Sequence, residues 1–216
     1  MNVIFDMDGL MFDTEKVFVK AWRYAGEKAG LGDTGYMAIK TLGMNEEACE
    51  KVWYETFGER YQPEEICQYK NRFLSDYYRQ HDVPVKKGLL ALLTYLKENK
   101  SKMAVASSSS RMEVEGFLER AGVRSYFDAV VCGDMIERSK PYPDIYIKAA
   151  SLLGESPLDC YALEDSKNGL LAAHRAGCRP VMIPDLWQPD EEILEIIAGK
   201  FDDLLQVKEA FQEKRI

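Results

Sequence analysis

The sequence predicts an α/β protein, a doubly wound parallel sheet with an all-helical segment inserted after its first strand. After residue 85, short apolar runs typical of buried strands alternate with helical patterns, which favours a parallel sheet covered by helices on both faces. A first apolar run stands alone at residues 3–5, and no strand pattern occurs between residues 15 and 82. We therefore expect a core domain of residues 1–14 and 85–216, and a helical cap domain of residues 15–84.

The inserted segment contains three helical patterns. The first begins after Thr14, a residue that can cap a helix, and ends at Gly30. The other two lie around residues 46–56 and 63–79 and are rich in aromatic residues, which we interpret as the packed core of a helical domain. Pro84, between two valines, marks the return of the chain to the main domain.

The remaining elements of the core domain follow in alternation. The strands are expected at residues 103–106, 129–132, 160–163 and 180–183. The helices are expected at residues 88–97, at 111–121, from 143 onward, at 167–176 and at 204–211. Gly122 and Gly177 each follow one of these helices and end it. Strands and helices in this order are typical of a sheet built from right-handed crossovers.

Composition and charge exclude several classes of function. The chain has 28 basic and 36 acidic residues, a net charge of −8, which disfavours a nucleic-acid partner. Its five cysteines are widely spaced and form no Cys-x-x-Cys pair, which indicates free thiols in a reducing compartment. There is no basic and apolar leader and no run long enough to span a bilayer. We expect a cytoplasmic monomer without a membrane partner.

The first strand ends in a cluster of acids. Asp6 and Asp8 follow it directly, Gly9 comes next, and Asp13 is close behind. Acids beside a buried strand are costly unless a cation or hydrogen-bond donors meet them, and glycine lets the chain turn sharply there. Ligands of open α/β sheets bind beyond such strand ends. A calcium loop is excluded by its spacing, since apolar residues fill the positions that need ligands. An acidic turn that caps the next helix is the remaining alternative.

Three later segments place polar residues at or beyond other strand ends. Ser107 follows the second strand, Lys140 lies in a proline-rich loop, and Glu164 and Asp165 follow an apolar strand. Each has a plainer explanation: a serine or an acid can be a helix N-cap, and a loop lysine is usually a solvated charge. A fixed ammonium can also neutralise phosphoryl oxygens, and two adjacent acids suit Mg²⁺.

In sequence and order these four segments resemble the four motifs of the haloacid dehalogenase superfamily, in its branch of phosphatases and phosphomutases. The matching stretches are Phe-Asp-Met-Asp-Gly at residue 5, the serine after the second strand, Lys-Pro-Tyr-Pro-Asp at residue 140, and Glu-Asp-Ser-x-x-Gly at residue 164. The resemblance covers the whole chain and implies a Rossmann-like core with a helical cap. Carboxylates are known covalent nucleophiles for phosphoryl groups.

The resemblance also implies roles for the motif residues. Asp6 would be the nucleophile that forms an aspartyl phosphate, and Asp8 the general acid and base. Ser107 and Lys140 would hold the phosphoryl oxygens, with help from the backbone amide of Ser108. Mg²⁺ would lie between the Asp6 carboxylate and the Asp8 carbonyl. Two acids of the fourth motif would complete its site: Asp165 as a direct ligand, and Glu164 as a ligand or as the holder of a metal-bound water.

Two cap positions bear on the choice between phosphatase and mutase. β-Phosphoglucomutases of this branch carry a histidine four residues after the threonine of the first motif, where this chain has Phe18. They also carry an arginine that grips a second phosphate, where this chain has Asn45 followed by an acid. Both departures disfavour a bisphosphorylated intermediate. Other cap cations could take the place of the arginine: Lys40, Lys70 or Arg72.

The leading hypothesis is therefore a Mg²⁺-dependent phosphatase that acts on a small phosphate monoester such as a sugar phosphate. Its partner would be a small phosphorylated metabolite. A sugar phosphomutase of the β-phosphoglucomutase type is the alternative, and a non-catalytic binding protein on the same fold is a third possibility. Four cap residues are candidates for contact with the part of the substrate away from phosphorus: Phe18, Trp22, Asn45 and Lys70.

Overall fold

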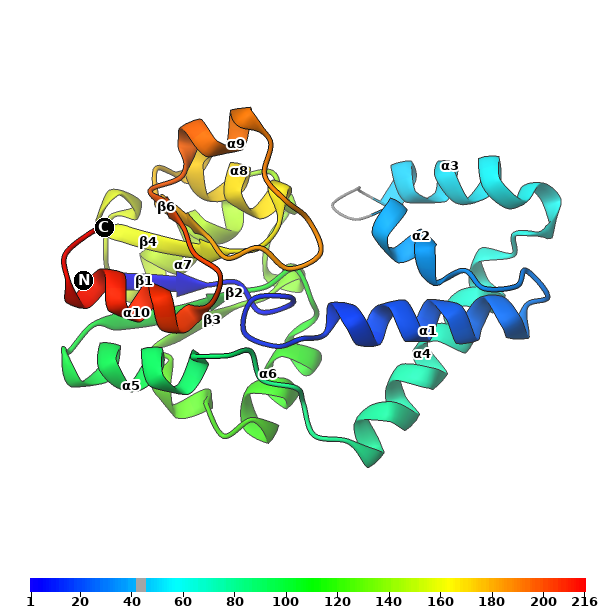
Figure 1. Ribbon diagram of the computed structural model, residues 1–216, viewed down its shortest axis with the longest axis horizontal. Helices are drawn as coiled ribbons and strands as arrows, with labels where there is room; N and C mark the ends of the chain where they lie inside the picture. Colours follow the sequence, from blue (N-terminus) through cyan, green and yellow to red (C-terminus); the bar gives the residue numbers. More distant parts are fainter. Residues whose placement is uncertain (42–45) are drawn as a thin grey trace. The chain divides into compact units, whose positions relative to one another are not determined.

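A computed structural model of the chain describes residues 1–41 and 46–216 (Figure 1). The described residues form two compact units. Residues 1–13 and 84–216 form one, called the core unit here, and residues 14–83 form the other, called the helical unit. Each junction lies one residue before the boundary expected from the sequence.

The core unit is built on a parallel sheet. Within the described residues the sheet has six strands in the order β3-β2-β1-β4-β5-β6, all parallel. They span Asn2–Phe5 (β1), Lys102–Ala106 (β2), Ala129–Val131 (β3), Cys160–Glu164 (β4), Arg179–Met182 (β5) and Gly199–Lys200 (β6). The central strand β1 pairs Ile4 with Ala104 on one side and Ala162 on the other. The predicted fold class, a doubly wound parallel sheet, is confirmed.

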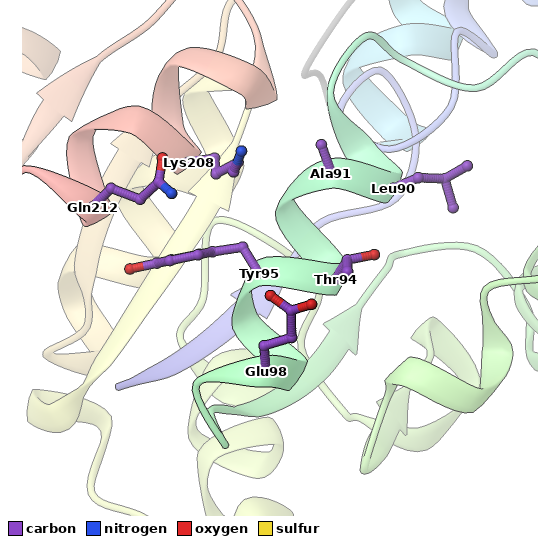
Figure 2. Close-up of a pocket in the computed structure, with 7 residues that line it drawn as sticks. All are labelled: Leu90, Ala91, Thr94, Tyr95, Glu98, Lys208 and Gln212. Carbon is purple, nitrogen blue, oxygen red and sulfur yellow. The ribbon is translucent and has the colours of Figure 1, made fainter.

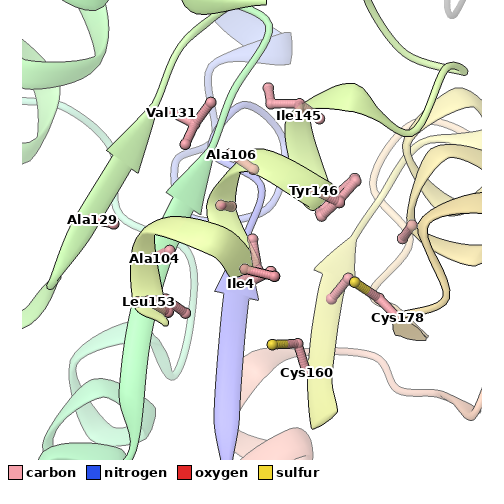
Figure 3. Packing of buried hydrophobic residues seen from close by; sticks show 14 of the residues in the cluster. Ile4, Ala104, Ala106, Ala129, Val131, Ile145, Tyr146, Leu153, Cys160 and Cys178 are labelled. Atoms are coloured by element: carbon pink, nitrogen blue, oxygen red, sulfur yellow. The ribbon is translucent and has the colours of Figure 1, made fainter. Parts of the chain in front are cut away.

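Small and apolar side chains let helices approach this sheet closely. Ile4, Ala104 and Ala162 are fully buried in one cluster with residues of α7 and α8, and Figure 3 shows Ile4 and Ala104 beside the helix that carries Ile145 and Leu153. Neighbouring positions on a strand point to opposite faces, so Tyr161 faces the other side, where its ring contacts Phe211 of α10 with centroids 5.1 Å apart. Both faces of the sheet are thus covered by helices, which explains why the inner positions of its central strands are apolar on both faces.

All helices described in the core unit except α9 lie close to predicted positions. They span Leu89–Glu98 (α5), Arg111–Arg120 (α6), Asp144–Leu153 (α7), Lys167–Ala176 (α8), Glu191–Ile196 (α9) and Leu204–Gln212 (α10). Short 3₁₀ turns occupy Arg124–Tyr126, Gly133–Met135 and Pro157–Asp159. Gly122 and Gly177 lie at positive φ, +69° and +89°, just after α6 and α8. Glycine accepts this conformation at low cost, so both helices end there as predicted.

The helical unit packs around an aromatic centre. Its helices span Glu15–Lys28 (α1), Gly35–Lys40 (α2), Glu46–Phe57 (α3) and Pro63–Gln80 (α4), with a 3₁₀ turn at Gly58–Arg60. Trp53 is 3% exposed, and the centroid of its ring lies 4.9 Å from that of Trp22, 5.4 Å from that of Phe57 and 5.2 Å from that of Tyr61. The aromatic residues of this segment therefore form a packed helical core, as the sequence predicts.

The elements that the sequence did not predict are short. They are α2, α9 and β6, each of six residues or fewer, too short to show a period in the sequence. The expectation that Thr14 can cap α1 agrees with its position at the start of that helix. Thr14 is the N-cap residue, but it has helical dihedral angles and its side chain makes no capping hydrogen bond. Among the described helices, none combines the length and the apolar character that a membrane span requires.

The two chain segments that leave and re-enter the core unit run side by side. The Asp13 amide donates to the Pro84 carbonyl at 2.8 Å, and the Lys86 amide donates to the Met11 carbonyl at 2.9 Å. Between them Phe12 and Val85 form an antiparallel bridge. The ends of the insertion are therefore joined by backbone hydrogen bonds within the core unit itself.

Candidate active site

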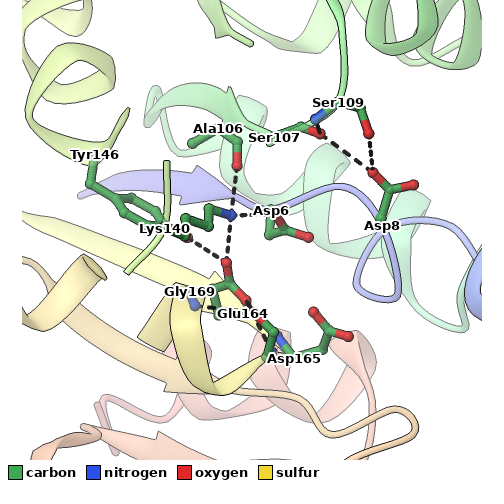
Figure 4. Close-up of polar contacts among 11 residues, drawn as sticks. Asp6, Asp8, Ala106, Ser107, Ser109, Lys140, Tyr146, Glu164, Asp165 and Gly169 are labelled. Atoms are coloured by element: carbon green, nitrogen blue, oxygen red, sulfur yellow. Dashed lines mark hydrogen bonds and ion pairs between the residues drawn. The ribbon is translucent and has the colours of Figure 1, made fainter. Parts of the chain in front are cut away.

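The predicted core-motif residues meet at the carboxyl edge of the sheet (Figure 4). Asp6 follows β1, Ser107 follows β2, and Glu164 is the last residue of β4. The Asp6 amide donates to the Leu163 carbonyl at 3.0 Å, which extends the pairing of β1 and β4 to the site. Carboxyl ends of parallel strands share one edge, so residues far apart in sequence are gathered there.

Lys140 lies at the centre of this cluster. Its ammonium donates to Oδ1 of Asp6 at 2.5 Å, to Oε1 of Glu164 at 2.6 Å and to the Ala106 carbonyl at 3.1 Å. A lysine has three N–H donors, so all three are used. Its side chain is only 7% exposed. Burial works against the charged form, but the two carboxylates more than offset it and raise the pKa of Lys140 above its ordinary value.

The cluster carries more negative than positive charge. Burial raises the pKa of Asp6 well above its usual range; Lys140 opposes the rise, and Glu164 and Asp8 add to it. One ammonium cannot neutralise Asp6 and Glu164 together, and Asp165, 9% exposed, lies beside them. Oxygens of these three carboxylates lie within 4.8 Å of one another. Such a cluster has the charge and the donor atoms that suit a divalent cation.

Glu164 is fully buried, and both of its oxygens accept several hydrogen bonds. Oε1 accepts from Lys140 and from the Tyr146 hydroxyl at 2.8 Å. Oε2 accepts from the Asp165 and Ser166 amides, both at 3.1 Å, and from the Ser166 hydroxyl at 2.9 Å. A carboxylate has about four acceptor sites. The carboxylate of Glu164 is therefore held in one orientation by protein donors.

Ser166, and neither acid, is the N-cap of α8. Its hydroxyl accepts from the Gly169 amide at 3.1 Å. The alternative in which Glu164 or Asp165 is the N-cap of this helix is therefore wrong. Likewise α6 begins with a capping box formed by Ser110 and Glu113, so Ser107 is not an N-cap either.

Asp8 is held from the loop that follows β2. The Ser109 hydroxyl donates to Oδ2 of Asp8 at 2.8 Å, and the Ser107 hydroxyl lies 3.4 Å from the same oxygen. The Ser109 amide in turn donates to the Ser107 hydroxyl at 3.1 Å, so the loop and the Asp8 side chain support each other. Ser108, between these two serines, is exposed.

Three residues of this neighbourhood were not predicted. Ser109 is one of four consecutive serines, and the sequence does not show which of them contacts an acid. A polar run directly after a strand does indicate that the site lies near it. Tyr146 lies among the apolar residues of α7, and a buried tyrosine hydroxyl needs a partner. Gly133 allows the loop after β2 to pack against the backbone that follows β3, because a β-carbon on Gly133 would lie 2.2 Å from the Ser108 carbonyl oxygen.

Three of the four cap candidates lie together in the helical unit. The Lys70 ammonium is 5.0 Å from the centroid of the Trp22 ring and 5.9 Å from that of Phe18. All three side chains are half-buried, and Trp22 also packs against Trp53. Such distances permit cation–π attraction. Asn45, the fourth candidate, lies outside the described residues.

The other two cap cations have partners of their own. The Lys40 ammonium donates to the Thr56 hydroxyl at 3.1 Å. Arg72 is exposed and lies 4.0 Å from Asp76 on the same helix. Of the three cations proposed as substitutes for the mutase arginine, Lys70 is the one beside the aromatic candidates.

Two surface grooves of the core unit are formed by other residues. One of about 410 Å³ is lined by residues of α5 and α10 (Figure 2). Another of about 470 Å³ lies along α7 and includes Arg138 and Lys148. Neither groove is lined by a predicted site residue.

Comparisons with known proteins agree with the motifs. A family model described as "Haloacid dehalogenase-like hydrolase" matches residues 3–183. A phosphorylated carbohydrates phosphatase from Thermotoga maritima is 33% identical over 184 residues, 81% of each chain. A β-phosphoglucomutase from Bacillus subtilis is 32% identical over 81% of this chain and 79% of its own. The structure of CbbY from Rhodobacter sphaeroides in complex with phosphate is similar, with a TM-score of 0.76, 26% identity and 95% coverage of both chains.

Proposed function

This chain belongs to the haloacid dehalogenase-like hydrolase family, and on that premise we propose that it is a Mg²⁺-dependent phosphatase of a small phosphate monoester, a sugar phosphate. The observation that carries the proposal is the contact of Lys140 with Asp6. A buried carboxylate at a strand end, fixed by an ammonium on one oxygen, is a nucleophile placed beside the cation that would meet an incoming phosphate.

The reaction that these residues support has two steps. A carboxylate oxygen of Asp6 attacks phosphorus and forms an aspartyl phosphate, while the bond to the leaving oxygen breaks and Asp8 gives that oxygen a proton. Water then attacks the phosphorus, Asp8 takes its proton, and the bond to Asp6 breaks to release phosphate. Lys140 and Ser107 would hold the phosphoryl oxygens in both steps, with the Ser108 amide beside them. Ser109 keeps the Asp8 carboxylate oriented between turnovers.

The acids of the cluster fit Mg²⁺. When bound, the ion would offset the repulsion between the carboxylates and the phosphate. Asp6 and Asp165 are the carboxylates we assign to it, together with the Asp8 carbonyl, since Mg²⁺ takes one or two carboxylates from most proteins. Glu164 is within reach, but it would have to give up one of its hydrogen bonds to bind the ion. When Asp6, Glu164 and Asp165 are ionised, Lys140 offsets only one of their three negative charges. The remaining two charges in a buried cluster are the physical reason for assigning a cation to it.

The helical unit favours hydrolysis over mutase chemistry. Phe18, at the position of the mutase histidine, offers an aromatic ring and no proton donor. Lys70 beside Trp22 and Phe18 combines one cation with two ring faces, a surface suited to one sugar ring and less to a second phosphate. Overall similarity does not separate the two activities, because identity to the phosphatase and to the mutase differs by one percentage point.

Phosphate release from a panel of phosphate esters, with Mg²⁺ and with EDTA, tests the proposal. We expect release that requires the metal and is abolished by Asp6→Asn with the fold intact by circular dichroism. Asp76→Asn is the matched control, since Asp76 is an exposed acid of α4 and should leave the rate unchanged. Near-normal turnover by Asp6→Asn would overturn the nucleophile assignment.

A second arm separates the alternatives. β-Glucose 1-phosphate is incubated with a bisphosphate activator, and glucose 6-phosphate is measured beside free phosphate. Isomerisation that outruns release would make the chain a phosphomutase. A folded protein silent in both assays, yet able to bind phosphate esters, would be a non-catalytic binding protein.

A further inference from the structure

We propose that Tyr146 is a positioning residue that acts through Glu164 on Lys140, a role that rests on the phosphatase function proposed above. Tyr146 lies in the first turn of α7, six residues after Lys140, and its side chain is fully buried. In Figure 4 its hydroxyl points from α7 toward the carboxylate of Glu164, on the side where Lys140 approaches.

The hydroxyl and the ammonium share one acceptor atom. Oε1 of Glu164 accepts from Tyr146 at 2.8 Å and from Lys140 at 2.6 Å. The two donors occupy both acceptor sites of that oxygen, while backbone amides and Ser166 hold the other oxygen. Without the hydroxyl, the buried carboxylate would lose one of its two donors at Oε1. Its plane would then be free to tilt, and Lys140 would follow it away from Asp6.

Tyr146 also contacts Lys140 directly. The Lys140 ammonium lies 5.3 Å from the centroid of the Tyr146 ring, within the range of cation–π attraction. The ring and the hydroxyl therefore constrain the same lysine in two ways: the ring through electrostatic attraction of the ammonium, and the hydroxyl through Glu164. Burial and the nearby carboxylates raise the pKa of Tyr146 well above its usual range, so its hydroxyl stays protonated as a donor.

Two substitutions separate these contributions. Tyr146→Phe removes the hydroxyl and keeps the ring, and Tyr146→Leu removes both. Tyr161→Phe is the matched control, because Tyr161 is a buried tyrosine of β4 that contacts Phe211 on the opposite face of the sheet. Folding of each variant is checked by circular dichroism and thermal unfolding, so that loss of structure is recognised as such.

Steady-state kinetics with the best phosphate ester give the first readout. We expect Tyr146→Phe to lower kcat about tenfold with KM changed by less than about twofold, because the lost hydrogen bond is to a charged group that orients a transition-state contact. Tyr146→Leu should lower kcat further, and Tyr161→Phe should not change it. In a Glu164→Gln background, Tyr146→Phe should have an effect of less than about twofold, since the hydroxyl acts through that carboxylate.

The second readout is independent of turnover. In metal-free protein labelled with ¹⁵N-lysine, we expect the buried Lys140 ammonium to give a resolved signal whose protons exchange slowly with water. Tyr146→Phe should speed that exchange at least about fivefold, and Tyr161→Phe should leave it unchanged. An unchanged exchange rate in folded Tyr146→Phe, or an equal loss of kcat with and without Glu164→Gln, would overturn the proposal. If the wild type releases no phosphate, the proposed function fails, and the exchange rate still decides whether Tyr146 positions Lys140.

Discussion

A β-carbon on Gly169 would lie 1.7 Å from Oε1 of Glu164, 1.9 Å from its Cδ and 2.3 Å from Oε2. Gly169 is the third residue of α8, where glycine is otherwise unfavourable for the helix. Gly169 is therefore needed because it has no side chain: the buried carboxylate of Glu164 occupies the space that a β-carbon would fill.

Gly169→Ala should consequently destabilise the protein and remove activity. The methyl group displaces Glu164 from Lys140 and overpacks a buried site, at a cost of about 1–3 kcal/mol in the free energy of unfolding. Urea unfolding and phosphate release measure the two effects. Gly116→Ala in α6 is the control, since a β-carbon there meets nothing within 4 Å and should stabilise the helix by about 0.5–1 kcal/mol. Equal behaviour of the two variants would contradict this account of Gly169.

Lys140→Met should make stability depend on pH in a defined direction. Removing the ammonium leaves Asp6 and Glu164 buried without their cation, which costs about 3–5 kcal/mol when both are ionised. The pKa of Asp6 in the folded protein is already raised, and the substitution raises it further. An acid whose pKa is higher in the folded than in the unfolded protein contributes its full stabilisation at a pH below the unfolded pKa, which is near 4. The folded protein loses that contribution as the pH rises through the folded pKa.

The deficit of Lys140→Met relative to wild type should therefore be larger at pH 8 than at pH 4.5. Urea unfolding in EDTA at the two pH values checks this, with metal excluded because it would compensate the charge. A deficit that is constant over this range would mean that removing the ammonium does not raise the pKa of either carboxylate in the folded variant.

Lys70→Met should change substrate preference more than chemistry. We expect kcat/KM for the preferred sugar phosphate to fall about tenfold, while p-nitrophenyl phosphate, which lacks the sugar hydroxyls, changes by less than about twofold. Arg72→Met, an exposed cation of the same helix, is the control. Equal losses for both substrates would remove Lys70 from the specificity residues.

The thiols should divide into two classes in the native protein. Cys132, Cys160 and Cys178 are buried, and burial raises the pKa of their thiols to about 11, 11 and 12 respectively. Since the thiolate is the reactive form, these three should resist Ellman's reagent at pH 8. Cys49 and Cys67 are half-buried, so at most two thiols should react before unfolding and all five afterwards. Rapid reaction of more than two would contradict the burial of the other three.

Local sequence patterns predicted most strands and helices of the core unit and the acids at the strand ends. They did not predict contacts between side chains that are far apart in the sequence. Asp6 and Glu164 were located because each directly follows an apolar strand, and the sheet then brings them together. Tyr146 was not found, because its hydroxyl faces a carboxylate on another element that only the folded chain brings near. The two-residue strand β6 carries no periodic signal of its own. For the cap, Phe18, Trp22 and Lys70 were candidates from the sequence, but no sequence pattern could place their side chains together.

The hydrogen bond from Asp13 to Pro84 gives the insertion a modular character. The two ends of residues 14–83 join the core unit next to each other. A tight turn of a few residues could therefore join Asp13 to Pro84 without moving the strands of the sheet. Segments of quite different length or sequence could be grafted at the same point. Evolution, or an engineer, could thus exchange the segment proposed here to contact the substrate and keep the proposed catalytic residues of the core unit unchanged.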